Sequence, residues 1–273
     1  MRYGFFTPAD SPLFTKYSLK KMILQMELYN NSVICPCYLK EKGHPLLINS
    51  NSIDDILSYE GTCGIRGAIM TLKNVGFMNL PDPALIMDAD TPEDYEAMIQ
   101  YEKNRAVPTK EVCAELHEYF LTPKKIQKHC EKVAITAVEI SKSLIEKGYY
   151  LDIEKVQSGA LVHDIFRDKK NHAAEGAKLL EDLGFIGIAP VVKAHTELDE
   201  YDSHHINEKS VVYLADKLVY RDSMISLEER FKRKMELYKN DEYTYKIIKK
   251  RYKQAQKVQK MIKQAIKGEG SRG

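Results

Sequence analysis

The stretch Leu161-Val162-His163-Asp164-Ile165 places a histidine next to an aspartate at the end of an apolar run with helical periodicity. Neutral imidazole and carboxylate groups are both good ligands for Zn²⁺, Fe and Mn²⁺. Further ionisable residues lie within or at the edge of other apolar helical patterns: His129, His172, His195 and Asp216. An ionisable side chain in such a position is costly unless it is paired or metal-bound. Together these residues are sufficient to hold two metal ions.

The composition indicates an ordinary intracellular protein. The 273 residues suit one large domain or two small ones, and the net charge of +2 gives no general argument for a nucleic-acid partner. Five cysteines without paired spacing indicate reduced thiols, and the spacing in Cys35-Pro36-Cys37 differs from that of a Cys-x-x-Cys zinc knuckle. No apolar run approaches the roughly 20 residues that span a bilayer, and the N-terminus does not resemble a signal peptide. We therefore expect a cytoplasmic protein without a membrane or nucleic-acid partner.

The first hundred residues predict alternating strands and helices. Strands are expected at 3–7, 33–39, 46–48 and 84–87, and helices at 18–28, 53–59 and 65–73, with Ser18 as the first helix cap. Thr91-Pro92-Glu93-Asp94 is typical of a helix start, because proline occupies the first helical position and acids follow it. This helix should end near Arg105, and the break at Ala106-Val107-Pro108 predicts a domain boundary.

The rest of the chain predicts an all-α bundle. Thr109, Asp152 and Asn171 are expected helix caps, and further helices should begin near residues 123, 189 and 210. No strand is needed here, so the candidate ligands should point inward from several helices. From Leu227 onward a Lys/Arg-rich helical stretch with an apolar stripe runs to Gly268–Gly273. Such a helix can bind nucleic acid or a membrane surface, but packing on the bundle with its lysines in water is the favoured interpretation.

Two motifs in this half resemble those of a known family. Ala160-Leu161-Val162-His163-Asp164-Ile165 and Tyr213-Leu214-Ala215-Asp216-Lys217, with His129 upstream, resemble the HD superfamily of metal-dependent phosphohydrolases. The resemblance covers about residues 109–239 and leaves 240–273 as a basic helical extension. It implies that His129, His163 and Asp216 hold one Fe, Mn or Zn ion, that His172 and His195 hold a second, and that Asp164 bridges the two.

The activity that the resemblance implies is hydrolysis of a nucleotide or another phosphate ester. One divalent cation lowers the pKa of its water, and a second one clamps the phosphoryl oxygens. Arg167 is the first candidate for binding the phosphate, because its planar fork pairs with two oxygens, and Lys217 is the second. Either could instead be a solvated surface charge. Simpler interpretations apply to the remaining histidines, which are assigned to a polar loop, a Gly-His-Pro turn and an exposed helix face: His204, His205, His44 and His117.

The N-terminal part resembles a different family. Four motifs in order resemble the second half of the MobA-like nucleotidyltransferases, which attach CMP or GMP to molybdopterin: Phe6-Thr7-Pro8-Ala9-Asp10-Ser11-Pro12, Gly43-His44-Pro45, Gly61-Thr62-Cys63-Gly64-Ile65-Arg66 and Asp88-Ala89-Asp90-Thr91-Pro92-Glu93-Asp94. This resemblance implies a partial, Rossmann-like α/β half-domain over residues 1–105. Asp10 would hold Mg²⁺ with assistance from Asp88, and Gly43 and His44 would lie beside the substrate.

The phosphate-binding part of that family has no counterpart here. A triphosphate cradle needs successive free backbone N–H groups and flexible glycines, and the cluster from Gly61 to Gly67 follows no convincing buried strand. We therefore expect a remnant, a start codon assigned too late, or half of a split protein, without nucleotidyl transfer by this chain alone. The expected partners are a phosphorylated small molecule or nucleotide, a missing nucleotidyltransferase half or a molybdenum-enzyme maturation factor. A cofactor cytidylyl- or guanylyltransferase with a regulatory HD part, and a non-catalytic module, are the alternatives.

Overall fold

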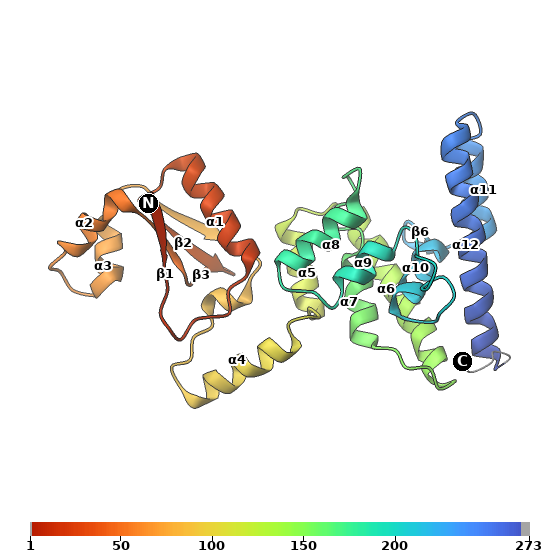
Figure 1. Ribbon diagram of the computed structural model, residues 1–273, viewed down its shortest axis with the longest axis horizontal. Coiled ribbons are helices and arrows are strands. Elements are labelled where there is room, and N and C mark those ends of the chain that lie inside the picture. The colour runs from red at the N-terminus through yellow and green to blue at the C-terminus, as the bar shows by residue number, and fades with distance from the viewer. Residues whose placement is uncertain (1, 269–273) are drawn as a thin grey trace. The chain divides into compact units, whose positions relative to one another are not determined.

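The computed structural model describes residues 2–268, so the predicted glycine-rich end beyond Gly268 lies outside the described residues (Figure 1). The chain forms two compact units. One comprises the chain through Arg105 together with Asp182–Gly184, and the other comprises Ala106–Glu181 and the residues from Phe185 onward. Among residues 2–268, no helix combines the length and the apolar character that a bilayer span requires.

The N-terminal unit is built on a mixed five-stranded sheet. Its strands are β1 (Tyr3–Phe6), β2 (Val33–Tyr38), β3 (Glu41–Lys42), β4 (Leu46–Asn49) and β5 (Val75–Asn79). The order is β1-β4-β2-β3, and β5 also pairs with β2. The β1–β4, β2–β4 and β2–β3 pairs are antiparallel, whereas β5 runs parallel to β2 with Val33 opposite Val75. The predicted α/β character of this part is confirmed.

Helices cover the two faces of this sheet because side chains alternate along each strand. On one face, Val33, Cys35 and Leu46 pack with Ile69 of α3 (Gly64–Thr71) and with Ile56 of α2 (Ile53–Leu57). On the other face, Ile34 and Leu47 are fully buried. The helix α1 (Lys16–Tyr29) contacts the same strands, β2 and β4. The unit therefore has a core on each side of its sheet.

Two local predictions in this unit are wrong, and one strand was missed. Residues 84–87, expected as a strand, lie in a 3-10 helix and its end, η2 (Pro83–Ile86), while the strand β5 was not predicted. Thr15, not Ser18, caps α1, since its side chain accepts a hydrogen bond from the Ser18 amide. The buried Asp82 explains this arrangement, because its Oδ2 accepts from the Thr15 amide at 2.8 Å and from the Ser18 hydroxyl at 2.6 Å. The helix start at Thr91 is confirmed: α4 (Pro92–Asn104) has a capping box between Thr91 and Asp94.

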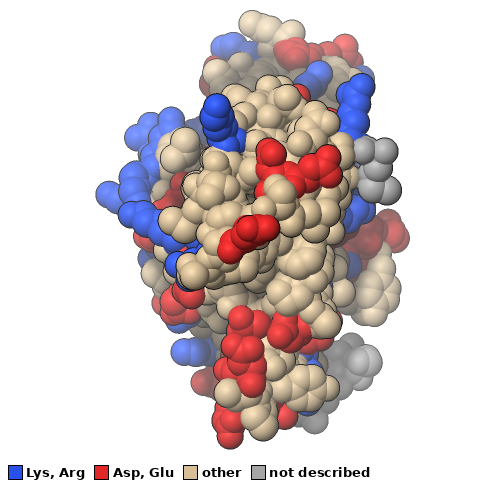
Figure 2. Space-filling model, turned by 90° about the vertical axis from the view of Figure 1, so that its left-hand side faces the viewer, with Lys and Arg blue, Asp and Glu red and all other residues tan. Residues whose placement is uncertain are grey.

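The face of the molecule in Figure 2 carries charges of both signs. Uncharged side chains cover most of it, and the Lys/Arg and Asp/Glu side chains form small separate groups. A surface of this kind accords with the net charge of +2 and does not create a field of a single sign.

The C-terminal unit is a helical bundle. Its helices are α5 (Lys110–Tyr119), α6 (Lys124–Ile145), α7 (Ile153–Val162), α8 (His172–Asp182), α9 (Ala189–Ala194), α10 (Glu208–Leu218), α11 (Leu227–Leu237) and α12 (Glu242–Lys267). A two-stranded hairpin, β6 (Val219–Tyr220) and β7 (Ser223–Met224), follows α10. The prediction of a bundle is confirmed, but the expectation of no strand missed this hairpin.

The core of the bundle lies between α6, α7 and α10, which contact one another. Buried residues from all three helices form one cluster, which includes Val133, Val156 and Leu214. Val258 and Ile262 of α12 belong to the same cluster, so the basic terminal helix packs on the bundle as favoured above. This packing fixes the helices that carry the candidate ligands.

Candidate metal centre

The candidate ligands come from the ends of helices that meet in the bundle. His163 and His195 are the C-cap residues of α7 and α9, and Asp216 lies in the last turn of α10. His172 is the first residue of α8, and His129 lies in the second turn of α6. The unpaired carbonyls at a helix C-terminus carry partial negative charge, which favours a nearby cation.

Asp164 lies between two pairs of histidines. Its Oδ2 is 3.8 Å from Nε2 of His129 and 3.5 Å from Nε2 of His163. Its Oδ1 is 3.4 Å from Nε2 of His172 and 3.3 Å from Nε2 of His195. The side chain of Asp164 is completely buried. Each carboxylate oxygen therefore faces its own pair of imidazole nitrogens.

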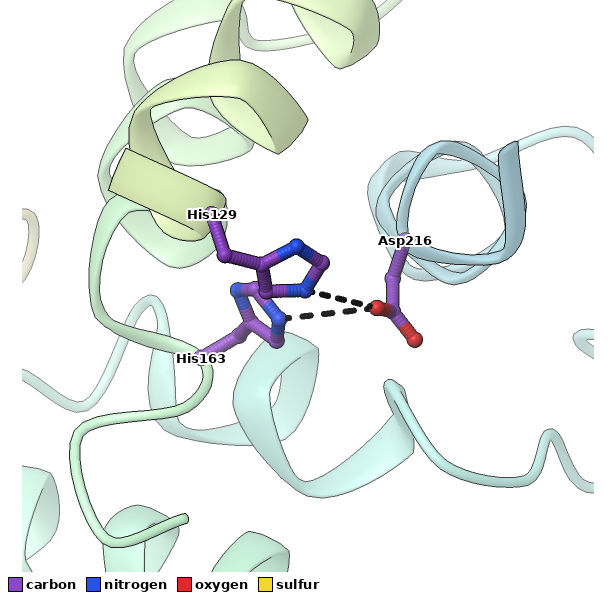
Figure 3. Close-up of side chains that lie close together, drawn as sticks. All are labelled: His129, His163 and Asp216. Carbon is purple, nitrogen blue, oxygen red and sulfur yellow. Dashed lines mark hydrogen bonds and ion pairs between the residues drawn. The ribbon is translucent and has the colours of Figure 1, made fainter. Parts of the chain in front are cut away.

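Asp216 closes one side of this arrangement (Figure 3). Its Oδ1 is 3.1 Å from Nε2 of His129 and 3.8 Å from Nε2 of His163. The ligand atoms of His129, His163 and Asp216 lie within 4.8 Å of one another, as do those of His163, Asp164 and His195. Ligand atoms bound to one Zn²⁺ at about 2.0–2.2 Å are separated by roughly 3–4 Å. The spacing of the side chains therefore fits the coordination of a divalent metal ion.

Backbone carbonyls orient three of the imidazole rings. Nδ1 of His129 donates to the Arg221 carbonyl at 2.8 Å, Nδ1 of His163 to that of Ala160 at 2.7 Å, and Nδ1 of His195 to that of Val192 at 2.6 Å. Because a carbonyl oxygen only accepts, each Nδ1 carries a proton and each Nε2 is directed toward the carboxylates. Nε2 of His163 and Oδ1 of Asp164 are buried without a hydrogen-bond partner among residues 2–268. This donor set fits a transition-metal cation.

The electrostatics of the cluster also indicate a need for positive charge. Burial alone would raise the pKa of Asp164, but the charge of His163 outweighs it and holds that pKa well below its usual range. Burial alone would lower the pKa of His163, yet the Asp164 carboxylate raises it well above its usual range. Burial lowers the pKa of His195 to about 4 and also lowers that of His172. In the absence of a metal, a proton on His163 therefore supplies the charge that a cation would supply.

Metal binding to the metal-free protein is expected to release about one proton near pH 7, because His163 must be neutral to coordinate an ion. The affinity should then rise by about tenfold per pH unit below the raised pKa of His163. Titration calorimetry with Zn²⁺ in two buffers of different ionisation enthalpy would measure the number of protons released. An affinity that does not change between pH 6 and 8 would contradict this expectation.

Two buried cations hold Asp216. Lys217 Nζ donates to Asp216 Oδ2 at 2.6 Å and to the His195 carbonyl at 2.7 Å. Arg230 of α11 donates to the Asp216 carbonyl at 2.6 Å and to Oδ1 at 3.4 Å. Burial would raise the pKa of Asp216, but Lys217 and Arg230 outweigh it and lower that pKa well below its usual range. Lys217 is only 5% exposed, so its interpretation as a solvated surface charge is wrong.

Arg167 occupies a more open position beside Asp164. Its guanidinium donates to Asp164 Oδ2, and 43% of its side chain is exposed. It lines a pocket of about 680 Å³ together with His129, Asp164 and Arg230. Arg167 therefore lies where a molecule in the pocket could contact both its guanidinium and the candidate ligands.

Two buried residues near the cluster were missed in the sequence. Arg230 lies between Leu227 and Phe231 on the buried side of α11. A basic residue within an apolar stripe could have predicted from the sequence that this side chain is buried. His117 is 6% exposed and its Nε2 lies 2.7 Å from the Leu161 carbonyl, so the prediction of an exposed helix face is wrong. His204 and His205 are exposed in a loop, as expected.

The candidate residues of the N-terminal unit do not gather in one place. Gly43 and His44 line a pocket of about 800 Å³, and a Cβ on Gly43 would lie 1.9 Å from the Leu85 carbonyl oxygen. Asp10 and Asp88 are exposed and do not line this pocket. The structure therefore brings Gly43 and His44 together and leaves the two predicted Mg²⁺-binding acids outside.

Comparison with known proteins finds one family that resembles part of the bundle. Residues 126–221 match the family of the HD domain. HD-domain proteins are metal-dependent phosphohydrolases, so the match supports a metal-dependent hydrolase at this general level. An uncharacterized protein of Methanocaldococcus jannaschii is 28% identical over an aligned length of 131 residues, and the match covers 41% of this chain and 77% of that protein. No solved structure matches the chain. None of these comparisons supports the MobA-like part of the resemblance.

Proposed function

We propose that the C-terminal unit hydrolyses a phosphate ester, such as a nucleotide, with two bound divalent ions. The observation that carries this proposal is the position of Asp164, whose two oxygens each face a separate pair of histidines. In this assignment His129, His163 and Asp216 would hold one Fe, Mn or Zn ion, His172 and His195 would hold a second, and Asp164 would be a ligand of both. The phosphohydrolase is assigned to residues 109–239.

The bound ions would supply an activated water at neutral pH and neutralise charge on the phosphoryl oxygens. The side chains of the protein would position the phosphate group and the metal ligands. Arg167 can pair with two phosphoryl oxygens through its planar guanidinium, at the point where the pocket reaches Asp164. Lys217 and Arg230 keep Asp216 ionised and hold its carboxylate in place, so they act through Asp216.

Replacing His172 with alanine is expected to remove one of two metal ions and to leave the other. The remaining ligands of the first ion, His129, His163, Asp164 and Asp216, do not depend on His172. Hydrolysis of a phosphate ester should fall by more than about tenfold, since both ions are needed to place the water and the phosphoryl group. Elemental analysis of the metal-replete variant, with rates on p-nitrophenyl phosphate, would measure both effects.

His204→Ala is the matched control, because His204 is exposed in a loop. The control should keep the metal content and the rate of the unaltered protein. Metal-replete protein that carries no transition metal would refute the proposed function. Full metal content and full rate in the His172 variant would refute the second ion.

A further inference from the structure

The pocket beside the metal centre is strongly basic. Six of its twelve lining residues are Lys or Arg, and two are acidic. The basic residues are Lys124, Lys125, Lys128, Arg167, Arg221 and Arg230. The pocket therefore contains more positive side chains than the two acids in its lining can neutralise.

Only some of these cations are neutralised within the protein. Arg167 pairs with Asp164, and Arg230 pairs with Asp216. The other four form no ion pair with any residue between 2 and 268: Lys124, which donates to the Gln127 side chain, Lys125, Lys128 and Arg221. Four positive charges in the pocket are therefore not in an ion pair with any acid in the described part of the chain.

The start of α6 adds to this excess. Pro123 is the N-cap residue, no side chain caps the helix, and its first turn contains no acid. Lysines at the positive end of a helix dipole are unfavourable, whereas an anion there is favourable. Lys125 and Lys128 lie at this end, close in sequence to His129, which lines the same pocket. An anion bound in this pocket would interact favourably with the lysines and with the helix.

We infer that the substrate carries a second phosphate group, which Lys125, Lys128 and Arg221 bind while the first group lies at Asp164 and His129. This inference rests on the proposed phosphohydrolase function and names its substrate class as organic molecules with at least two phosphates. Ile126 and Tyr220 also line the pocket and provide apolar contacts for the organic part. The unpaired cations determine substrate preference, and the candidate metal ligands bind the group that reacts.

Two hydrolysis-resistant probes test this inference by binding alone. Propylphosphonate and propane-1,3-bisphosphonate differ only in the second anionic group. Calorimetry on protein incubated with Mn²⁺ should show tighter binding of the bisphosphonate by about tenfold or more, because charge-assisted contacts to two cations are added. In the Lys125→Ala/Lys128→Ala variant this preference should fall to within about threefold.

Lys142→Ala/Lys147→Ala is the matched control, because it removes the same charge in the last turn of α6 and just beyond it, where both lysines are exposed. The control should retain the full preference for the bisphosphonate. An equal affinity of the unaltered protein for the two probes would overturn the inference, and so would a preference that survives in the Lys125/Lys128 variant. Failure to hydrolyse any ester would instead count against the proposed function, since this assay requires no turnover.

Discussion

Replacing Asp164 with alanine is expected to abolish phosphohydrolysis and to release both metal ions. The two oxygens of this carboxylate face all four candidate histidines, and without it Asp216 is the one carboxylate left among the candidate ligands, which cannot balance the charge of two divalent ions. The rate should fall by more than about a hundredfold, beyond the 10- to 100-fold loss typical of residues that only support a ligand. Metal content and the rate on p-nitrophenyl phosphate would measure the effect.

The fold should survive this change, because the core of the bundle comes from apolar residues of α6, α7, α10 and α12. Asp168→Ala is the control, since Asp168 is exposed and lies four residues further along the chain. Its metal content and rate should remain those of the unaltered protein. A folded Asp164 variant with its full metal content would mean that the carboxylate has a structural role, and the two-ion assignment would be wrong.

Replacing Lys217 with methionine is expected to destabilise the metal-free protein by about 3–5 kcal/mol, the usual cost of removing one partner of a buried ion pair. The substitution removes the donor to Asp216 Oδ2 and to the His195 carbonyl while keeping most of the side-chain volume. Arg230 would remain as a second cation beside Asp216. Denaturant unfolding monitored by circular dichroism would measure the change in the free energy of unfolding.

The same variant should lose less stability when metal is bound, because an ion on Asp216 would partly replace the missing charge. Lys193→Met is the control: Lys193 is exposed on α9, and its replacement should change stability by less than about 0.5 kcal/mol. An equal loss with and without metal would show that Asp216 is not a ligand. A stable metal-free Lys217 variant would show that the buried pair contributes little.

The apolar helical patterns were sufficient to predict which residues gather, whereas an arrangement with Asp164 shared between two sets of histidines was expected only from the family resemblance. His129, Asp164 and Asp216 were recognisable because ionisable residues interrupt apolar helical runs, and the structure places their side chains together. The pairing of each Asp164 oxygen with two histidines depends on the crossing of helices far apart in the chain. Arg230 escaped prediction because α11 is rich in charge, and the position of this residue between Leu227 and Phe231 was the one signal that distinguished it from the exposed cations.

The errors in the N-terminal unit have a similar origin. Val75–Asn79 contains Gly76 and Asn79, which are poor strand formers, but it becomes a strand by hydrogen bonding to β2. The local sequence did not predict this strand because β2 lies far earlier in the chain. The apolar run at 84–87 reads as a strand, yet Asp82 and Pro83 start a 3-10 helix there. In β5, long-range strand pairing outweighed the low strand propensity of the residues. In η2, the local helix start outweighed their strand propensity.

The acceptors that fix His129, His163 and His195 are all main-chain oxygens. An alanine scan of the residues that provide them would therefore leave the acceptors in place, and the scan would underestimate how strongly the ring orientations are constrained. The ring contacts therefore do not depend on the side chains of Ala160, Val192 and Arg221, although Ala160 and Val192 are themselves buried in the core. At Arg221 the backbone itself restricts replacement, because its φ of 59° favours glycine or asparagine.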